Sequence, residues 1–174
     1  MTFKYQLIFL GDITNSACGE IRSRFYEIIK DMGLSQDAFI EIYASNFVSD
    51  YLNKQPSFVY YFGKKNHNDK DVDLLKTLML NGDAIIPVYF HKEAYNEEIP
   101  TQVSMMNGKI YTADKKDDFV NYALEALRLM RQNRKLFISY RRNDSTAIAN
   151  QLYDTLVRCN YDVFLDAYSI GPAR

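Results

Sequence analysis

The chain has 174 residues, of which 47% are hydrophobic and 25% charged, and this composition is that of a folded globular protein, neither disordered nor membranous. Its formal net charge of −1 provides no overall field that would attract nucleic acid or an acidic membrane, so neither is expected as a partner. Two cysteines, Cys18 and Cys159, are too few for a disulfide framework, and no apolar run reaches the length of a membrane span, which together favour a cytoplasmic protein.

Apolar segments alternate with amphipathic segments over most of the chain. In chain order the sequence predicts a strand over residues 5–10, a helix over 16–32, a strand over 39–43, a short helix over 47–53, a strand over 58–62, a helix over 72–80, a strand over 84–90, a short strand over 109–112 and a helix over 117–134. Asp71 is the expected N-cap of the helix over 72–80. Pro87 lacks an N–H, so its strand should lie near a sheet edge or pair only beyond the proline.

Strands that alternate with helices in this way predict an α/β fold, with a doubly wound, flavodoxin-like parallel sheet over residues 1–134. A strand over residues 136–138, a helix over 146–158 and a strand over 163–165 then form one further βαβ unit, in which the two strands are parallel neighbours. We therefore expect one domain over residues 1–134 and the start of a second over residues 135–174.

The last βαβ unit carries an unusual set of polar residues at the carboxyl ends of its strands. Tyr140, Arg141 and Arg142 follow the first strand, and Asp166 and Ser169 follow the second. Ligands of open α/β sheets bind beyond these strand ends, where helix N-termini also point. Arginine binds phosphate through paired N–H groups and an aromatic ring stacks on a base, so the cluster suits a flat, phosphate-bearing ligand.

The same residues resemble a known family. The segments FISYRRND (137–144) and FLDAYSI (164–170) are similar to box 1 and the BB-loop box of the TIR (Toll/interleukin-1 receptor) domain. Their residues are close to those of TIR domains that cleave NAD, including bacterial defence proteins. The resemblance covers residues 135–172, about a fifth of the chain. More weakly, residues 82–88 look like the fourth-strand region of a TIR domain, so the first domain can be a TIR relative in which Gly11 and Asp12 stand in place of box 1.

The resemblance implies the N-terminal part of a bacterial TIR protein of immunity or signalling, whose complete TIR domain hydrolyses NAD at the nicotinamide–ribose bond. NAD is then the substrate and no cofactor is expected. Tyr140, Arg141, Arg142 and Asp166 would hold the dinucleotide, while the loop around Ser169 would gate the site and mediate association with other TIR domains. In the family the catalytic glutamate lies on a later helix, so we expect it beyond residue 174 and expect this chain alone to be inactive. The first domain would serve sensing, through an unknown activating partner, or assembly.

Two alternatives remain open: a TIR scaffold without enzymatic activity, and a flavodoxin-like domain that binds a small ligand. The first domain contains neither a GxGxxG nor a P-loop motif. We interpret Asp12 as a loop aspartate, and His67 and His91 as residues without a second ligand at metal spacing, so no metal is expected. Ser16 and Cys18 are interpreted as helix caps in preference to nucleophiles. The acidic residues of segment 93–98 are interpreted as a solvated face.

Overall fold

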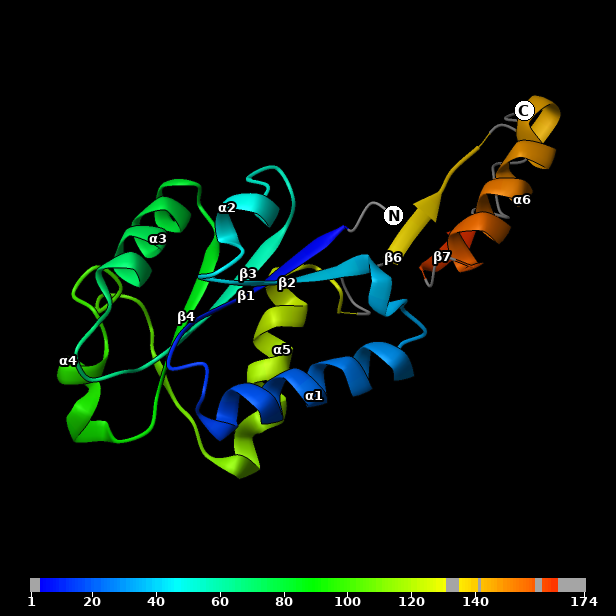
Figure 1. The fold of residues 1–174 in the computed structure, drawn as a ribbon. Coiled ribbons are helices and arrows are strands. Elements are labelled where there is room, and N and C mark those ends of the chain that lie inside the picture. Colours follow the sequence, from blue (N-terminus) through cyan, green and yellow to red (C-terminus); the bar gives the residue numbers. More distant parts are fainter. Residues whose placement is uncertain (1–3, 131–134, 141, 159–160, 166–174) are drawn as a thin grey trace. The chain divides into compact units, whose positions relative to one another are not determined.

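The structure, a computed structural model, describes residues 4–130, 135–140, 142–158 and 161–165. The chain divides into two compact units, Met1–Leu127 and Arg128–Arg174, and each is described by itself (Figure 1). The boundary expected from the sequence follows residue 134, at the end of a segment, 131–134, that lies outside the described residues.

A five-stranded sheet in which every pairing is parallel forms the centre of the first unit. Its strands are β1 (Tyr5–Gly11), β2 (Phe39–Tyr43), β3 (Ser57–Phe62), β4 (Ala84–Tyr89) and β5 (Lys109–Ile110). They are arranged in the order β2-β1-β3-β4-β5, which is the doubly wound order of flavodoxin-like folds. The predicted fold class is therefore confirmed.

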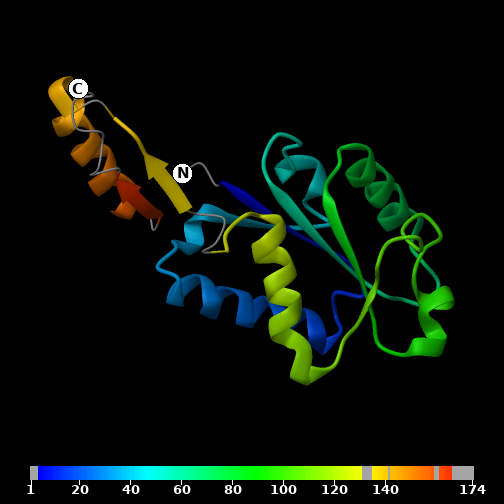
Figure 2. The same cartoon turned by 180° about the vertical axis from the view of Figure 1, so that it is seen from behind.

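Helices cover both faces of this sheet. They are α1 (Ser16–Asp31), α2 (Phe47–Asp50), α3 (Asp69–Leu80), α4 (Tyr95–Glu98) and α5 (Lys116–Ala126), with short 3-10 turns at Gln36–Ala38, Lys92–Ala94 and Ala113–Lys115. Helices α1 and α5 lie side by side on one face, and α2 and α3 lie on the other (Figures 1 and 2). The short helices at Lys92–Ala94 and Tyr95–Glu98 lie between β4 and β5 in the chain.

The central strand β3 is buried at all six positions, as expected for a strand covered by helices on both faces. On the α1 and α5 face, Tyr60 stacks on Phe9 and its hydroxyl donates a hydrogen bond of 2.8 Å to the carbonyl of Phe119 in α5. On the opposite face, Tyr61 packs in a cluster that includes Leu75 of α3. Burial of each such large side chain contributes about 1.5–3 kcal/mol.

Pro87 occupies a position in β4 where a missing N–H does not interrupt the pairing with β3. The Val88 carbonyl accepts from the Gly63 N–H at 2.7 Å and the Tyr89 carbonyl accepts from the Tyr111 N–H at 2.8 Å, so Val88 faces β3 and Tyr89 faces β5. Alternation along a parallel strand then turns Pro87 away from β3. Strand β5 pairs only with Val88 and Tyr89, beyond the proline, which confirms the expectation from the sequence.

Three predicted helix ends of the first unit were wrong. Helix α2 ends at Asp50, where the sequence had suggested residue 53. Helix α3 is capped by Asn68, whose side chain accepts from the Lys70 N–H at 3.1 Å, so Asp71 lies inside the first turn instead of capping it. Helix α5 ends at Ala126, not at residue 134, because the chain turns out of the helix at Arg128, where φ is +57°.

The second unit consists of β6 (Lys135–Ile138), α6 (Arg142–Arg158) and β7 (Asp162–Leu165), with the two strands paired in parallel. The predicted βαβ unit is thus present, and its helix begins at residue 142, where the sequence had suggested 146. Ala149 of α6 is buried, whereas the register partners Phe137 and Phe164 are 67% and 51% exposed. One face of the β6–β7 pair is therefore uncovered by described residues of its own unit.

In the described part of the chain, no helix combines the length and the apolar character needed to cross a membrane.

Candidate functional site

Two of the residues predicted to hold a dinucleotide, Tyr140 and Arg142, lie just beyond the carboxyl end of β6. Tyr140 follows β6 after one intervening residue and is half-buried, and Arg142 is the first residue of α6. Ile138 and Leu165 are register partners, so both strands end at the same edge of their sheet. Arg141, Asp166 and Ser169 lie outside the described residues, as does the side chain of Arg142.

This edge can attract an anion through its backbone alone. The first N–H groups of a helix have no partner within the helix and carry the positive end of its dipole, and α6 is 17 residues long. A phosphate beyond the end of β6 could accept hydrogen bonds from these N–H groups. Tyr140 precedes the helix by two residues in the sequence, so its phenol ring belongs to the same edge. The arrangement is suited to binding and orienting an anion.

A second group of polar residues lies at the carboxyl ends of β1 and β3 in the first unit. Asp71 is only 5% exposed there, and its burial raises the pKa of the carboxyl group, while Lys64 and a hydrogen bond from the Gly11 backbone act in the opposite direction. Asp12 accepts a hydrogen bond of 2.6 Å from Thr14 of its own loop. Sequence reasoning missed the burial of Asp71, because a charged residue in a first helical turn ordinarily faces water.

Glu98 corrects the interpretation of segment 93–98 as a solvated face. Its side chain is 9% exposed, and among the described residues its Oε2 atom has no hydrogen-bond partner. It packs over Gly63, where an added Cβ would lie 3.1 Å from both the Glu98 Cβ and the Val88 carbonyl oxygen. The Lys64 N–H also donates to the Glu98 carbonyl at 3.0 Å, so α4 is fastened to the end of β3.

The candidate nucleophiles and metal ligands of the first unit do not form a reactive centre. Asn15 caps α1, in place of Ser16 or Cys18, by accepting from the Ala17 N–H at 3.0 Å. Cys18 is buried, and desolvation raises the pKa of its thiol to about 11, which keeps it protonated and unreactive. His67 pairs with the Tyr61 hydroxyl at 3.3 Å, and no metal-binding group of three or more acidic, histidine or cysteine side chains occurs in the described part of the chain.

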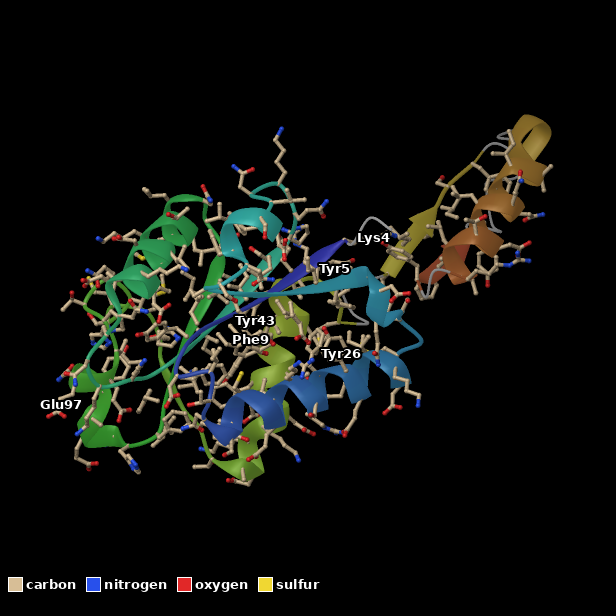
Figure 3. All side chains as sticks on the ribbon, in the orientation of Figure 1. Lys4, Tyr5, Phe9, Tyr26, Tyr43 and Glu97 are labelled. Atoms are coloured by element: carbon tan, nitrogen blue, oxygen red, sulfur yellow. The ribbon has the colours of Figure 1, made fainter. Side chains whose placement is uncertain are left out.

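Two donors converge on Glu41, at the centre of strand β2. Its carboxylate accepts from Arg22 Nε at 2.6 Å and from the Tyr43 hydroxyl at 2.8 Å, and burial, followed by the negative charge of Glu41, raises the pKa of Tyr26. Burial, followed by the hydrogen bond to Glu41, raises the pKa of Tyr43 to about 12. Figure 3 shows Tyr26 on α1 and Tyr43 on β2. We refer to Arg22, Tyr26, Glu41 and Tyr43 as the Glu41 cluster.

A surface cleft of about 450 Å³ opens beside the Glu41 cluster, between α1, the 3-10 turn at Gln36–Ala38 and β2. Its lining is Arg22, Ser23, Tyr26, Gln36, Asp37, Phe39 and Glu41. The sequence contained one signal for this cleft, which is the alternation in FIEIY that places Phe39, Glu41 and Tyr43 on one face of a strand.

No model of a known protein family matches this chain, and no curated protein matches it significantly.

Proposed function

We propose that residues 128–174 belong to a TIR-type domain that cleaves NAD in a bacterial protein of immunity or signalling, and that residues 1–127 form its sensing or assembly module. The observation that carries this proposal is the parallel βαβ unit, in which Tyr140 and the N-terminus of α6 follow β6 within the segment FISYRRND. The protein would act in the cytoplasm, where NAD is available and thiols such as Cys18 stay reduced.

In this function the chain's residues bind and orient the substrate. Arg141 and Arg142 would bind the diphosphate through paired N–H hydrogen bonds, and Tyr140 would stack on a flat ring of the substrate. The N-terminal N–H groups of α6 would complete the anion site. The loop that carries Asp166 and Ser169 would close over the substrate and contact other TIR domains. The acid that stabilises the ribosyl cation would come from the complete TIR domain.

The test uses the protein encoded by the complete gene, with nicotinamide release from NAD as the readout. Arg142→Ala should lower kcat/KM about tenfold to a hundredfold, since a charge-assisted hydrogen bond is worth about 1.5–3 kcal/mol. Arg158→Ala is the matched control, because it removes an exposed arginine from the other end of the same helix and should leave the rate unchanged. Equal rates for Arg142→Ala and the wild-type protein, with both folded by circular dichroism, would remove the phosphate-binding role.

A scaffold function without catalysis is the second candidate, and the uncovered apolar pair Phe137 and Phe164 favours it. Exposed aromatic patches are typical of association surfaces. A complete protein that self-associates in sedimentation experiments, loses association with Phe164→Ser and releases no nicotinamide would support the scaffold over the enzyme.

A further inference from the structure

The cleft beside the Glu41 cluster has the size of a site for a small molecule. Its volume of about 450 Å³ lies within the range of roughly 300–1,000 Å³ that is usual for such sites. Three elements contribute to its lining, which are α1, the 3-10 turn at Gln36–Ala38 and β2. The charges and rings of this lining determine which class of molecule the cleft can hold.

The lining carries one negative charge that no described cation balances. Among the described residues that line the cleft, Arg22 alone is cationic, and its Nε already donates to Glu41 at 2.6 Å, so these two charges offset each other. The carboxylate of Asp37 forms no ion pair with the residues that the structure describes. The cleft therefore favours a cation over an anion.

Asp37 belongs to a turn whose backbone is fixed at both ends. Ser35 caps the turn by accepting a hydrogen bond from the Asp37 N–H at 3.3 Å, and the Phe39 N–H donates to the Gln36 carbonyl where the turn ends. The side chains of Asp37, Gln36 and Ser23 all line the cleft and make no hydrogen bond to another described residue. They leave a carboxylate and two neutral oxygen acceptors available to a ligand.

Two aromatic rings form the apolar part of the lining. Tyr26 projects from α1 toward β2, and its ring lies at 89° to that of Phe39 with 6.4 Å between the ring centroids (Figure 3). Phe39 is 8% exposed and Tyr26 is half-buried, so Tyr26 has the larger free surface. Aromatic rings attract cations as well as apolar groups. The molecule that fits this lining is thus a cation with an apolar body.

We propose that the cleft binds a small primary amine in its ammonium form, with an apolar or aromatic body. The ammonium lies at Asp37, and its three N–H groups donate to the Asp37 carboxylate and to the side-chain oxygens of Gln36 and Ser23. The body packs on Tyr26 and Phe39. A neutral molecule of the same shape lacks the attraction to Asp37, and a quaternary ammonium lacks the N–H donors. This inference is independent of the function proposed for the second unit.

The probe is 2-phenylethylammonium, titrated into the full 174-residue chain and followed by NMR of the backbone amides. The amides of Asp37 and Phe39 should shift to saturation, while 2-phenylethanol, which has the same body and a neutral hydroxyl, should bind about fivefold more weakly. The N,N,N-trimethyl derivative of the probe keeps the charge without the N–H groups and should also bind more weakly. Unshifted amides, or equal binding of the alcohol or of the trimethyl derivative, would overturn the proposal.

A matched pair of variants tests the role of Asp37. Asp37→Asn removes the charge, keeps the shape of the side chain and should lower the affinity for the probe to that for the alcohol. Asp31→Asn makes the same change of net charge at the exposed last residue of α1, outside the cleft lining, and should leave the affinity unchanged. With both variants folded by circular dichroism, wild-type affinity in Asp37→Asn, or an equal loss in the two variants, would refute the placement of the ammonium.

The source of the ammonium has its own measurement, because the side chain of a lysine in a partner protein carries the same group. Nα-acetyllysine N-methylamide presents this side chain on a peptide backbone and should bind more weakly than 2-phenylethylammonium, since its flexible stem gains less from the rings of Tyr26 and Phe39. Tighter binding of the lysine derivative would assign the cleft to a protein partner and overturn the small-molecule assignment.

Discussion

Replacement of Gly11 by alanine should destabilise the first unit far more than an ordinary glycine substitution. Gly11 ends β1 with φ at +81°, and a Cβ added there would lie 2.0 Å from the carbonyl oxygen of Phe62 in the neighbouring strand. A left-handed conformation costs an alanine about 1–2 kcal/mol. The contact with Phe62 adds to this, because the atom in the way is backbone of a fully buried strand and cannot rotate aside as a side chain can. We expect a loss of about 4 kcal/mol or more in the free energy of unfolding.

Gly82→Ala is the control that separates the two effects. Gly82 has a similar φ of +77°, but an added Cβ would meet nothing within 4 Å, so this variant should lose only the conformational cost of about 1–2 kcal/mol. Urea unfolding of both variants, followed by circular dichroism, measures the difference. If Gly11→Ala and Gly82→Ala were destabilised equally, the argument from the Phe62 carbonyl would be refuted.

Three further predictions concern polar residues of the first unit. Gln6 is fully buried, and its side chain accepts from the Leu52 N–H and donates to the carbonyls of Leu52 and Gln55. Gln6→Leu leaves these groups unpaired and should lower the free energy of unfolding by about 3 kcal/mol or more. A loss below about 1 kcal/mol in urea unfolding would contradict this. Asn68→Ala removes the cap of α3 and should cost about 1 kcal/mol, whereas Asn68→Asp should be nearly neutral in the same assay. Because burial raises the pKa of Asp71, its ionisation destabilises the fold, so the stability of Asp71→Asn relative to the wild-type protein should rise between about pH 3 and pH 6; a difference that stays constant across this range would argue against the burial effect.

The strands were predictable from the sequence because the short apolar runs seen there are the segments that form the sheet. Strand β2 spans residues 39–43 both in the prediction and in the structure, and the effect of Pro87 followed from the chemistry of its nitrogen. The end of α5 was not predictable, since the apolar spacing continues through Met130 while the backbone leaves the helix at Arg128. Local pattern records the helix-forming tendency of a segment and carries no information about where tertiary packing ends it.

The candidate sites divide in the same way. Tyr140 and Arg142 could be placed beyond β6 because the order of elements alone defines the carboxyl edge of a parallel sheet. The Glu41 cluster could not be found, because its partners come from elements that meet only in the fold. Arg22 and Glu41 are separated by 19 residues, and neither is unusual in its own segment.

The contact between α1 and α5 also affects how the first unit folds as it leaves the ribosome. Arg24 binds Asp117 through two hydrogen bonds, of 2.7 and 3.0 Å, across 93 residues, and Tyr60 of β3 requires the carbonyl of Phe119. A nascent chain that has not yet emerged as far as α5 therefore has only α1 to cover the face that carries Phe9 and Tyr60. Apolar surface that stays exposed until the last helix of a unit is made is prone to aggregation, so the cover that α5 supplies late in the sequence matters for folding as well as for stability.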